Sequence, residues 1–514
     1  MNEEQIPILV ACGQITDRSK DGAGLTPPQL MADACKEAVI DSGCERLLEK
    51  IDTIATSGLT IDAPGFSTPL SGSYSNLPKT VANLLGIHPS KYYSAATGGN
   101  TPQMLVNHFA GEIAEGRVGA VLLTGCEALC TMSQRFDHWT KLLLPRGGWR
   151  DKPGGQPTSI GDNRPGTNMH ESYYGLDLPA NTYPLFENAL TTHYQQSKAK
   201  HLQAVGNLFQ RFSEVAAQNP LAWFQQTHTA ESLTTPSSAN RMIAYPYTKL
   251  LNSMLSVNQA AALVLTSVAN AKSLGINTDK WIYLHGCADL HDIWNVSERV
   301  DYHSSPAMNE SASAALSMAN KNIDDIAFFD IYSCFPSAVQ IACDEFGIKH
   351  DDARGLTLTG GLPYFGGPGN NYSMHGIAEM MHKLREQPKE FGMVNANGWY
   401  LTKHSIGIYS NSAIKTPWVK PDLSNIQQQL IEAKAPTFTE NPDGKATIET
   451  YTVIFNRNNE PERGIVVGRL YTGERFLAET PNDLDTLNKF VDDEVIGMSG
   501  HVKKGKRLNV FQLK

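Results

Sequence analysis

Short apolar runs and segments of helical periodicity alternate along the first part of the chain. An apolar run at 6–13 precedes a helical pattern at 28–40, and a second apolar run follows at 51–58. Apolar runs of this length are typical of buried strands, and apolar residues at helical spacing are typical of a helix packed on a sheet. The pattern therefore predicts a strand–helix–strand unit.

The same order of elements returns later in the chain. Apolar runs at 281–286 and 323–334 flank a helical pattern at 311–320. Each copy continues with a further helix and strand, at 102–116 and 118–125 in the first and at 374–386 and 404–409 in the second. We therefore predict an α/β protein built from two βαβ-rich halves.

Composition divides the rest of the chain. Residues 128–245 carry many Pro, Gly, Asn and Trp residues among mixed helical segments, which indicates a loop or cap insertion. From 447 onward, short alternating runs and turn residues predict a small OB-like β-barrel. The expected parts are 1–127 with 246–279 as the first half, 128–245 as the insertion, 280–418 as the second half, and 419–514 as an added β domain.

Charge and hydropathy exclude several functions. The 514-residue chain has a formal net charge of -9, which argues against a nucleic-acid binder because phosphate contacts need clustered Lys and Arg. No run reaches the roughly 18 apolar residues that span a bilayer, and the first residues form no targeting signal, so we expect a cytoplasmic protein without membrane insertion. Eight cysteines in so long a chain do not indicate a disulfide framework, and Cys126 and Cys130, four apart, are followed by no Cys/His pair at zinc-ligand spacing.

The stretch at 330–340 is the richest in potential chemistry. A strand expected at 327–331 ends directly before Tyr332, Ser333 and Cys334. Ligands of open α/β sheets bind beyond the carboxyl ends of the strands. These three side chains are therefore expected at the edge of a ligand-binding crevice.

Together with the duplicated halves and the long insertion, a series of motifs resembles the thiolase superfamily. The motifs are Asn100-Thr-Pro-Gln103, Gly125-Cys-Glu127, Tyr332-Ser-Cys-Phe335, Gly360-Gly361 and His404. The likeness covers about residues 5–415 and is greatest to the sterol-carrier-protein type and to bacterial type 1 thiolase-like proteins, usually labelled acetyl-CoA acetyltransferases. It implies a duplicated thiolase fold with five αβαβα layers, an additional C-terminal domain, and acyltransferase chemistry on acyl-CoA in lipid metabolism.

Two catalytic positions of that superfamily hold glycine here. Thiolases use a nucleophilic cysteine at the start of a helix, where backbone amides favour the thiolate, and the matching position is Gly99. The histidine of the family's Gly-His-Pro motif, which activates that cysteine, corresponds to Gly367. Since glycine forms no acyl-enzyme, the resemblance does not extend to the two-step acyl-cysteine mechanism.

Four side chains remain as catalytic candidates. Tyr332 stands where the family motif has an oxyanion-binding histidine, and Cys334 matches its acid/base cysteine. His404 lies in a segment similar to the family's His-Asn-x-Gly motif and is a candidate general base, and His375 is the fourth candidate. The alternative interpretations are a buried structural thiol and neutral core histidines.

Coenzyme A or an acyl-CoA is the implied substrate or ligand, with no tightly bound cofactor. The glycine-rich loop that holds Gly366, Gly367 and Asn371 leads into a helix and offers backbone N–H groups to pantetheine or phosphate. Arg241 and Lys249 are candidates for contacts to the CoA phosphates. The assembly is expected to be a monomer or a homodimer.

Three functions agree with these residues. The first is acyltransferase-like chemistry on acyl-CoA thioesters without an acyl-cysteine. The second is retro-aldol cleavage of a 3-hydroxyacyl-CoA with the help of Tyr332. The third is non-catalytic binding of acyl-CoA, and the missing nucleophile and base leave open whether the protein is an enzyme.

Overall fold

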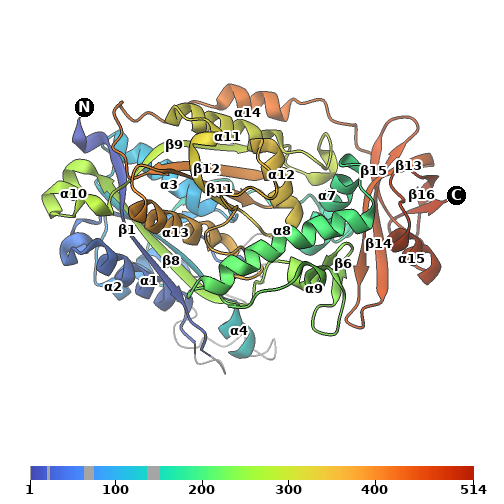
Figure 1. The fold of residues 1–514 in the computed structure, drawn as a ribbon, viewed down its shortest axis with the longest axis horizontal. Helices are drawn as coiled ribbons and strands as arrows, with labels where there is room; N and C mark the ends of the chain where they lie inside the picture. Colours follow the sequence, from blue (N-terminus) through green and yellow to red (C-terminus); the bar gives the residue numbers. More distant parts are fainter. Residues whose placement is uncertain (1, 20–23, 63–73, 136–150) are drawn as a thin grey trace.

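The computed structural model describes residues 2–19, 24–62, 74–135 and 151–514. Its main feature is a sheet of ten strands in the order β10-β11-β12-β9-β1-β8-β4-β2-β3-β5 (Figure 1). The strands are β1 (Pro7–Thr16), β2 (Thr53–Thr56), β3 (Lys91–Ala95), β4 (Ala120–Ala128), β5 (Thr158–Ile160), β8 (Asn258–Ser267), β9 (Ile282–His291), β10 (Ile326–Ile331), β11 (Phe391–Gly398) and β12 (Lys403–Ser410).

The two halves of the chain meet where β1 pairs with β9, through Ile8 with Tyr283 and Leu9 with Ile282. In the first half, β2 runs parallel to β3 and β4, while β8 is antiparallel to β4 and β1. In the second half, β10 runs parallel to β11, and β12 is antiparallel to β11 and β9. The predicted α/β fold with two similar halves is confirmed.

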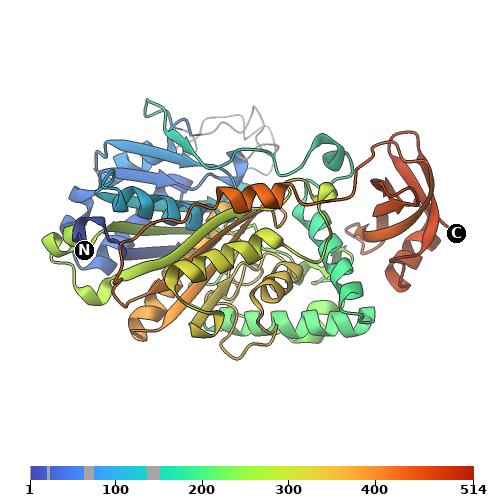
Figure 2. The same cartoon turned by 90° about the horizontal axis from the view of Figure 1, so that it is seen from above.

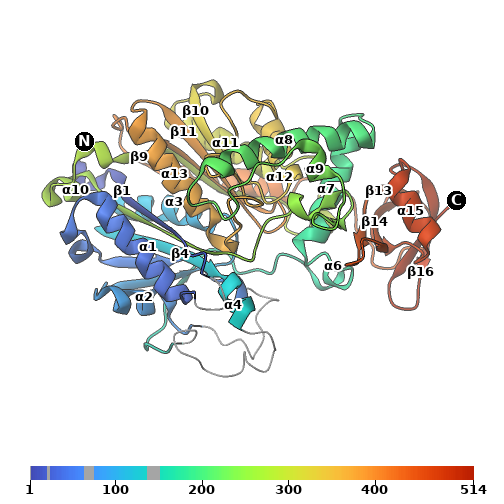
Figure 3. The same cartoon turned by 60° about the horizontal axis from the view of Figure 1, so that its bottom comes forward.

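Five helices complete the layers of this core. Helices α3 (Thr101–Ala114) and α13 (Tyr372–Glu386) contact each other and strands of both halves, so they form the central layer. Helices α1 (Pro27–Ser42) and α2 (Leu77–Leu85) cover the outer face of the first half, and α11 (Pro306–Ala319) covers β9 and β12 of the second (Figure 3). The result is the αβαβα order expected from the resemblance.

The central position explains the composition of α3. Most of the helix is buried: Leu105, Val106, Phe109 and Ala110 are fully buried, and so is the polar Gln103. A narrow stripe that includes His108 and Glu112, one helical turn apart, is partly exposed. Packing from both halves therefore fixes the N-terminus of α3, where the family's nucleophile would stand.

The insertion between the halves is mostly helical. Its longest helix, α8, buries Val205, Phe209, Phe212 and Ala216 on one face, which is the spacing of an amphipathic helix. Its neighbour α7 contacts both α12 of the core and β13 of the C-terminal domain. The elements of this region are α4 (Leu129–Arg135), α6 (Met169–Tyr173), α7 (Pro179–His193), α8 (Lys198–Gln218), α9 (Ala230–Thr234), β6 (Met242–Ala244) and β7 (Tyr247–Thr248). Two further helices, α10 (Val268–Leu274) and α12 (Pro336–Phe346), belong to the core.

The C-terminal part is a closed five-stranded barrel at the end of the molecule opposite the N-terminus (Figure 2). Its strand order is β13-β14-β15-β17-β16, and β13 closes the barrel by pairing with β14. This small barrel confirms the predicted C-terminal β-barrel, and its five strands suit an OB-like architecture. The elements are β13 (Gly444–Phe455), β14 (Pro461–Leu470), β15 (Arg475–Glu479), α15 (Leu484–Asp492), β16 (Ser499–Lys504) and β17 (Asn509–Leu513).

A helix before the barrel packs on the core instead. Helix α14 (Ser424–Ile431) contacts α11 and β9, and the Gln427 side chain exchanges two hydrogen bonds with the backbone of His291. The composition change near residue 416 therefore marks a connecting segment, and the barrel strands begin only at Gly444. No helix in the part of the chain that the structure describes is both long and apolar enough to cross a membrane.

Candidate active site

The side chain of Tyr332 lies against Gly99, the position that the sequence resemblance matches to the family's nucleophile. Tyr332 follows directly after β10, and a Cβ atom added to Gly99 would lie only 2.0 Å from its hydroxyl oxygen. The same Cβ would lie 2.5 Å from the backbone oxygen of Asn397. Because real side chains do not approach so closely, position 99 accepts no cysteine while Tyr332 keeps this position.

Hydrogen bonds hold the loop before α3 in place beneath Tyr332. The Gly98 N–H donates to the side-chain oxygen of Asn370 at 2.9 Å, and the Ser373 hydroxyl donates to the Gly99 carbonyl at 2.8 Å. The Tyr332 ring itself meets the Tyr372 ring edge to face at 5.4 Å. The loop and the ring are thus positioned by the segment that begins α13.

Burial controls the protonation of Tyr332. The residue is 7% exposed, and desolvation raises the pKa of its phenol well above the ordinary value, with a smaller contribution from Cys334. Its hydroxyl forms no hydrogen bond with any residue that the structure describes. At neutral pH, Tyr332 is therefore a protonated group with an O–H available to a ligand.

Cys334 lies in a small polar network. The Asn397 side-chain amide donates to the Tyr183 hydroxyl at 2.9 Å and approaches the Cys334 sulfur at 3.9 Å. The Tyr183 hydroxyl donates to the Trp399 carbonyl, and its ring stacks on Phe335 with the centroids 4.4 Å apart. Desolvation raises the pKa of the Cys334 thiol to about 12, so this group is a thiol and a proton donor at neutral pH.

The His404 side chain lies on the side of strand β12 that packs against α11. Its Nε2 lies 3.0 Å from a carboxylate oxygen of Asp292 and 3.1 Å from the hydroxyl of Ser305, which precedes α11. Burial alone would raise the pKa of Asp292, but the hydrogen bond and charge of His404 hold it below the ordinary value. His404 therefore packs against α11, and among the described residues no hydrogen bond links it to Tyr332 or Cys334.

His375 is a neutral imidazole in the central layer. It is fully buried in α13, and desolvation lowers its pKa to about 3. Its Nδ1 lies 2.8 Å from the side-chain oxygen of Gln14, and its ring packs on Phe365 at 5.1 Å. Its Nε2 is buried without a hydrogen-bond partner in the described part of the chain.

The glycine-rich loop is packed against the rest of the core. A Cβ at Gly367 would lie 2.1 Å from the Ser253 hydroxyl, so the place of the family's histidine is also filled. The Gly367 N–H donates to the Met254 carbonyl at 2.8 Å. Gly366 adopts a φ of +122°, which favours glycine, and the Asn371 amide donates to the Gly125 carbonyl at 2.7 Å. These groups bind the loop to the protein in this structure.

The predicted phosphate contacts lie on a different element. Arg241 and Lys249 flank the β6–β7 hairpin, whose strand β6 pairs with β13 of the barrel. The Arg241 guanidinium donates to the backbone oxygen of Met242, and Lys249 is exposed. The candidate CoA contacts are thus divided between this hairpin and the glycine-rich loop.

Sequence reasoning missed three groups near the loop before α3. Asn397 and Tyr183 adjoin Cys334, and Lys403 directs its ammonium toward the loop, donating to the Thr97 carbonyl at 2.5 Å. Lys403 was visible in the segment that contains His404, and strand alternation puts the two neighbours on opposite faces. Tyr183 comes from the helical insertion, where no motif pointed to the site.

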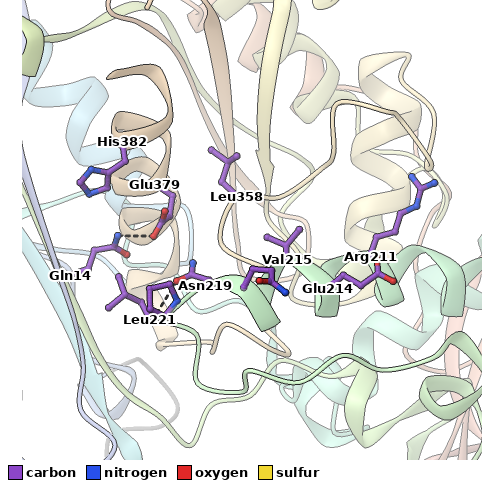
Figure 4. A pocket seen from close by; sticks show the side chains of 11 residues that line it. Gln14, Arg211, Glu214, Val215, Asn219, Leu221, Leu358, Glu379 and His382 are labelled. Carbon is purple, nitrogen blue, oxygen red and sulfur yellow. Dashed lines mark hydrogen bonds between the residues drawn. The ribbon is translucent and has the colours of Figure 1, made fainter. Parts of the chain in front are cut away.

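A cavity of 760 Å³ lies elsewhere, between α8, α13 and β1 (Figure 4). Within it, the Gln14 amide donates to the Glu379 carboxylate at 3.0 Å. Its charged lining consists of Arg211 and Glu214 from α8 and Glu379 and His382 from α13. None of the candidate catalytic residues lines this cavity.

The fold and the site together define a thiolase-like protein. Two similar halves enclose the helices α3 and α13, and a glycine stands at the start of α3. A sequence model described as the thiolase-like protein type 1 additional C-terminal domain matches residues 425–507. The structure is similar to that of a monomeric SCP2-thiolase like protein type 1 from Mycobacterium smegmatis, with 35% identity, coverage of 99% of this chain and 100% of the other, and a TM-score of 0.84. The chain therefore belongs to the family of type 1 SCP2-thiolase-like proteins.

Two more distant structures share the thiolase fold. The Ltp2-ChsH2(DUF35) aldolase has 20% identity over 79% of this chain and 98% of the other, with a TM-score of 0.56. Human mitochondrial 3-ketoacyl-CoA thiolase has 15% identity over 80% of this chain and 99% of the other, also with a TM-score of 0.56. No curated protein sequence matches the chain.

Proposed function

We propose that this protein binds an acyl-CoA thioester beside Tyr332 and Cys334 and performs acyltransferase-class chemistry without an acyl-enzyme. The observation that carries the proposal is the position of the Tyr332 hydroxyl, in the space of the missing nucleophile at Gly99. A protonated phenol there suits a hydrogen bond to the thioester oxygen, on which negative charge develops when an enolate forms.

The two raised pKa values agree with these roles. Tyr332 keeps its proton because burial opposes the phenolate, so it donates rather than accepts. The Cys334 thiol, with a pKa of about 12, has a proton to give to the α-carbon of the enolate. In cleavage of a 3-ketoacyl-CoA, the CoA thiol would attack the ketone carbon directly, the bond between C2 and C3 would break, and the CoA proton would restore the Cys334 thiol.

Retro-aldol cleavage of a 3-hydroxyacyl-CoA is the second candidate. Its support is that Gly99 and Gly367 are both packed against other groups, so that positions 99 and 367 supply neither the nucleophile nor its activating histidine. Retro-aldol cleavage needs neither group and forms the same thioester enolate. The two reactions differ in one requirement, because only the acyl transfer uses CoA as a second substrate.

Calorimetric titration with acetyl-CoA and acetoacetyl-CoA tests the binding step. We expect saturable binding in both cases, and we expect intact-mass spectrometry after incubation to show no acyl group on the protein. Absence of binding at millimolar ligand would overturn the proposal. An acyl adduct on a cysteine would also overturn it, because it would show the covalent mechanism. Release of acetyl-CoA from a 3-hydroxyacyl-CoA without added CoA would decide for the retro-aldolase.

A further inference from the structure

A second cavity, of 160 Å³, lies beside the N-terminus of α3. Neither Tyr332 nor Cys334 lines this cavity, whereas His404 does. With about 30 Å³ for one water in the liquid, the cavity has room for a molecule of only a few heavy atoms. Its lining includes Asn100, Met104, Asp162, His291, Trp294 and Lys403.

Lys403 is an unusual lysine because it is 7% exposed and has no carboxylate partner among the described residues. Its ammonium donates to two backbone carbonyls, those of Thr97 at 2.5 Å and Asp162 at 3.4 Å. A buried lysine that is not neutralised by an ion pair is costly, and such lysines occur where an amine is used in chemistry. Lys403 is also one of the residues that line the cavity.

Asn100 supplies a second, independent sign of a ligand. It is also 7% exposed, and its side-chain amide donates to the Ser405 hydroxyl at 3.2 Å. Its side-chain oxygen is buried and has no hydrogen-bond partner in the part of the chain that the structure describes. A buried acceptor without a partner costs free energy unless a ligand or water donates to it. The cavity wall thus carries both an amine and an unused acceptor.

Burial favours the neutral form of Lys403. Desolvation lowers its pKa to about 8; the Asp162 carboxylate opposes this shift, and Arg164 contributes a smaller lowering. Asp289 and His291 on β9 also line the cavity, and Asp289 is neutralised by Lys420 at 2.8 Å. A substantial part of Lys403 is therefore an unprotonated, nucleophilic amine near pH 8.

We propose that Lys403 forms an imine with a small aldehyde or ketone bound in this cavity. The neutral nitrogen attacks the carbonyl carbon, a C–N bond forms, and the carbonyl oxygen leaves as water with the two protons of the nitrogen. The Met104 and Trp294 side chains suit a short apolar substituent, and the Asn100 oxygen accepts a hydrogen bond from a hydroxyl on the bound molecule. This site is independent of the thioester chemistry proposed above.

Reductive trapping tests the proposal. The full chain is incubated at pH 8 with propanal and cyanoborohydride, and modified lysines are located by peptide mass mapping. An exposed lysine is about 1 part in 250 neutral at pH 8, whereas a lysine of pKa about 8 is half neutral, so we expect Lys403 to react at least tenfold faster than exposed Lys249. Reaction of Lys403 no faster than Lys249 would overturn the proposal.

Two variants separate the cavity from general reactivity. Lys403→Arg keeps a cation but removes the amine, and it should lose the fast-reacting site while the other lysines react as before. Met104→Trp keeps Lys403 and fills the cavity, and it should slow labelling of Lys403 at least tenfold, with Lys249 unchanged. Circular dichroism confirms that each variant is folded. Unchanged fast labelling of Lys403 in Met104→Trp would contradict binding in the cavity.

Discussion

The two sides of the loop before α3 differ in what they offer a ligand. On the side of Gly99, the Tyr332 ring fills the place of the nucleophile and leaves a single O–H without a partner among the described residues. On the side of Gly98, Lys403 lines a cavity, donates hydrogen bonds to two backbone carbonyls and lies over the Trp399 ring. The two sides of this loop thus present different groups, a buried phenol on one side and a buried amine on the other.

The largest expected effect comes from restoring the nucleophile alone. Gly99→Cys places a side chain 2.0 Å from the Tyr332 hydroxyl and 2.5 Å from a backbone oxygen, so it should lower the free energy of unfolding by about 3 to 4 kcal/mol. Tyr332→Ala opens the space, and the same cysteine should cost at least about 1.5 kcal/mol less in that background. Guanidinium unfolding of the four proteins in this double-mutant cycle measures the difference. Equal costs in both backgrounds would show that Tyr332 does not fill the site.

Lys403 should make stability depend on pH. Its pKa is near 8 in the folded protein and near 10.5 when unfolded, so the unfolded chain binds more protons between these values and stability rises with pH across that window. The shift corresponds to about 3 kcal/mol. The difference in unfolding free energy between wild type and Lys403→Met should therefore move by about 3 kcal/mol in favour of wild type from pH 7.5 to 10.5. A constant difference would contradict the buried, unpaired lysine.

Removal of the Tyr332 hydroxyl should have the smallest effect on stability. The hydroxyl makes no hydrogen bond to the described residues, so Tyr332→Phe should change the free energy of unfolding by less than about 1 kcal/mol. Thermal unfolding of the two proteins measures this, with Tyr183→Phe as control. Tyr183 uses its hydroxyl in a buried network, and its loss should cost more. A large loss for Tyr332→Phe would assign the hydroxyl a structural role.

Most of the core could be predicted because its strands are buried on both faces and appear as apolar runs. The run at 6–13 became β1, and the helical pattern at 28–40 became α1. The pairing of β1 with β9 could not be predicted, because it joins residues far apart in sequence and depends on how the halves dock. The contacts of α14 with α11 and β9 depend on the tertiary structure in the same way.

The site was predictable only in part. Motif order located Tyr332, Cys334 and the glycine at position 99, but not the contact between Tyr332 and Gly99, which requires the tertiary structure. The sequence does not show that Lys403 contacts the loop, because which face of β12 meets the loop depends on how the strand pairs; in the structure the lysine contacts the loop, and His404 contacts Asp292. The roles of the four candidate catalytic residues stay predictions.

Exchange of the α-protons of acetyl-CoA in D₂O, followed by mass spectrometry, tests the central claim that Tyr332 stabilises a thioester enolate in place of an acyl-enzyme. We expect wild type to catalyse deuterium incorporation, and Tyr332→Phe to reduce the rate about 100-fold, as expected for removal of one oxyanion donor, without a matching loss of acetyl-CoA affinity by calorimetry. Wild-type exchange no faster than the uncatalysed rate, or equal exchange by wild type and Tyr332→Phe, would contradict the account.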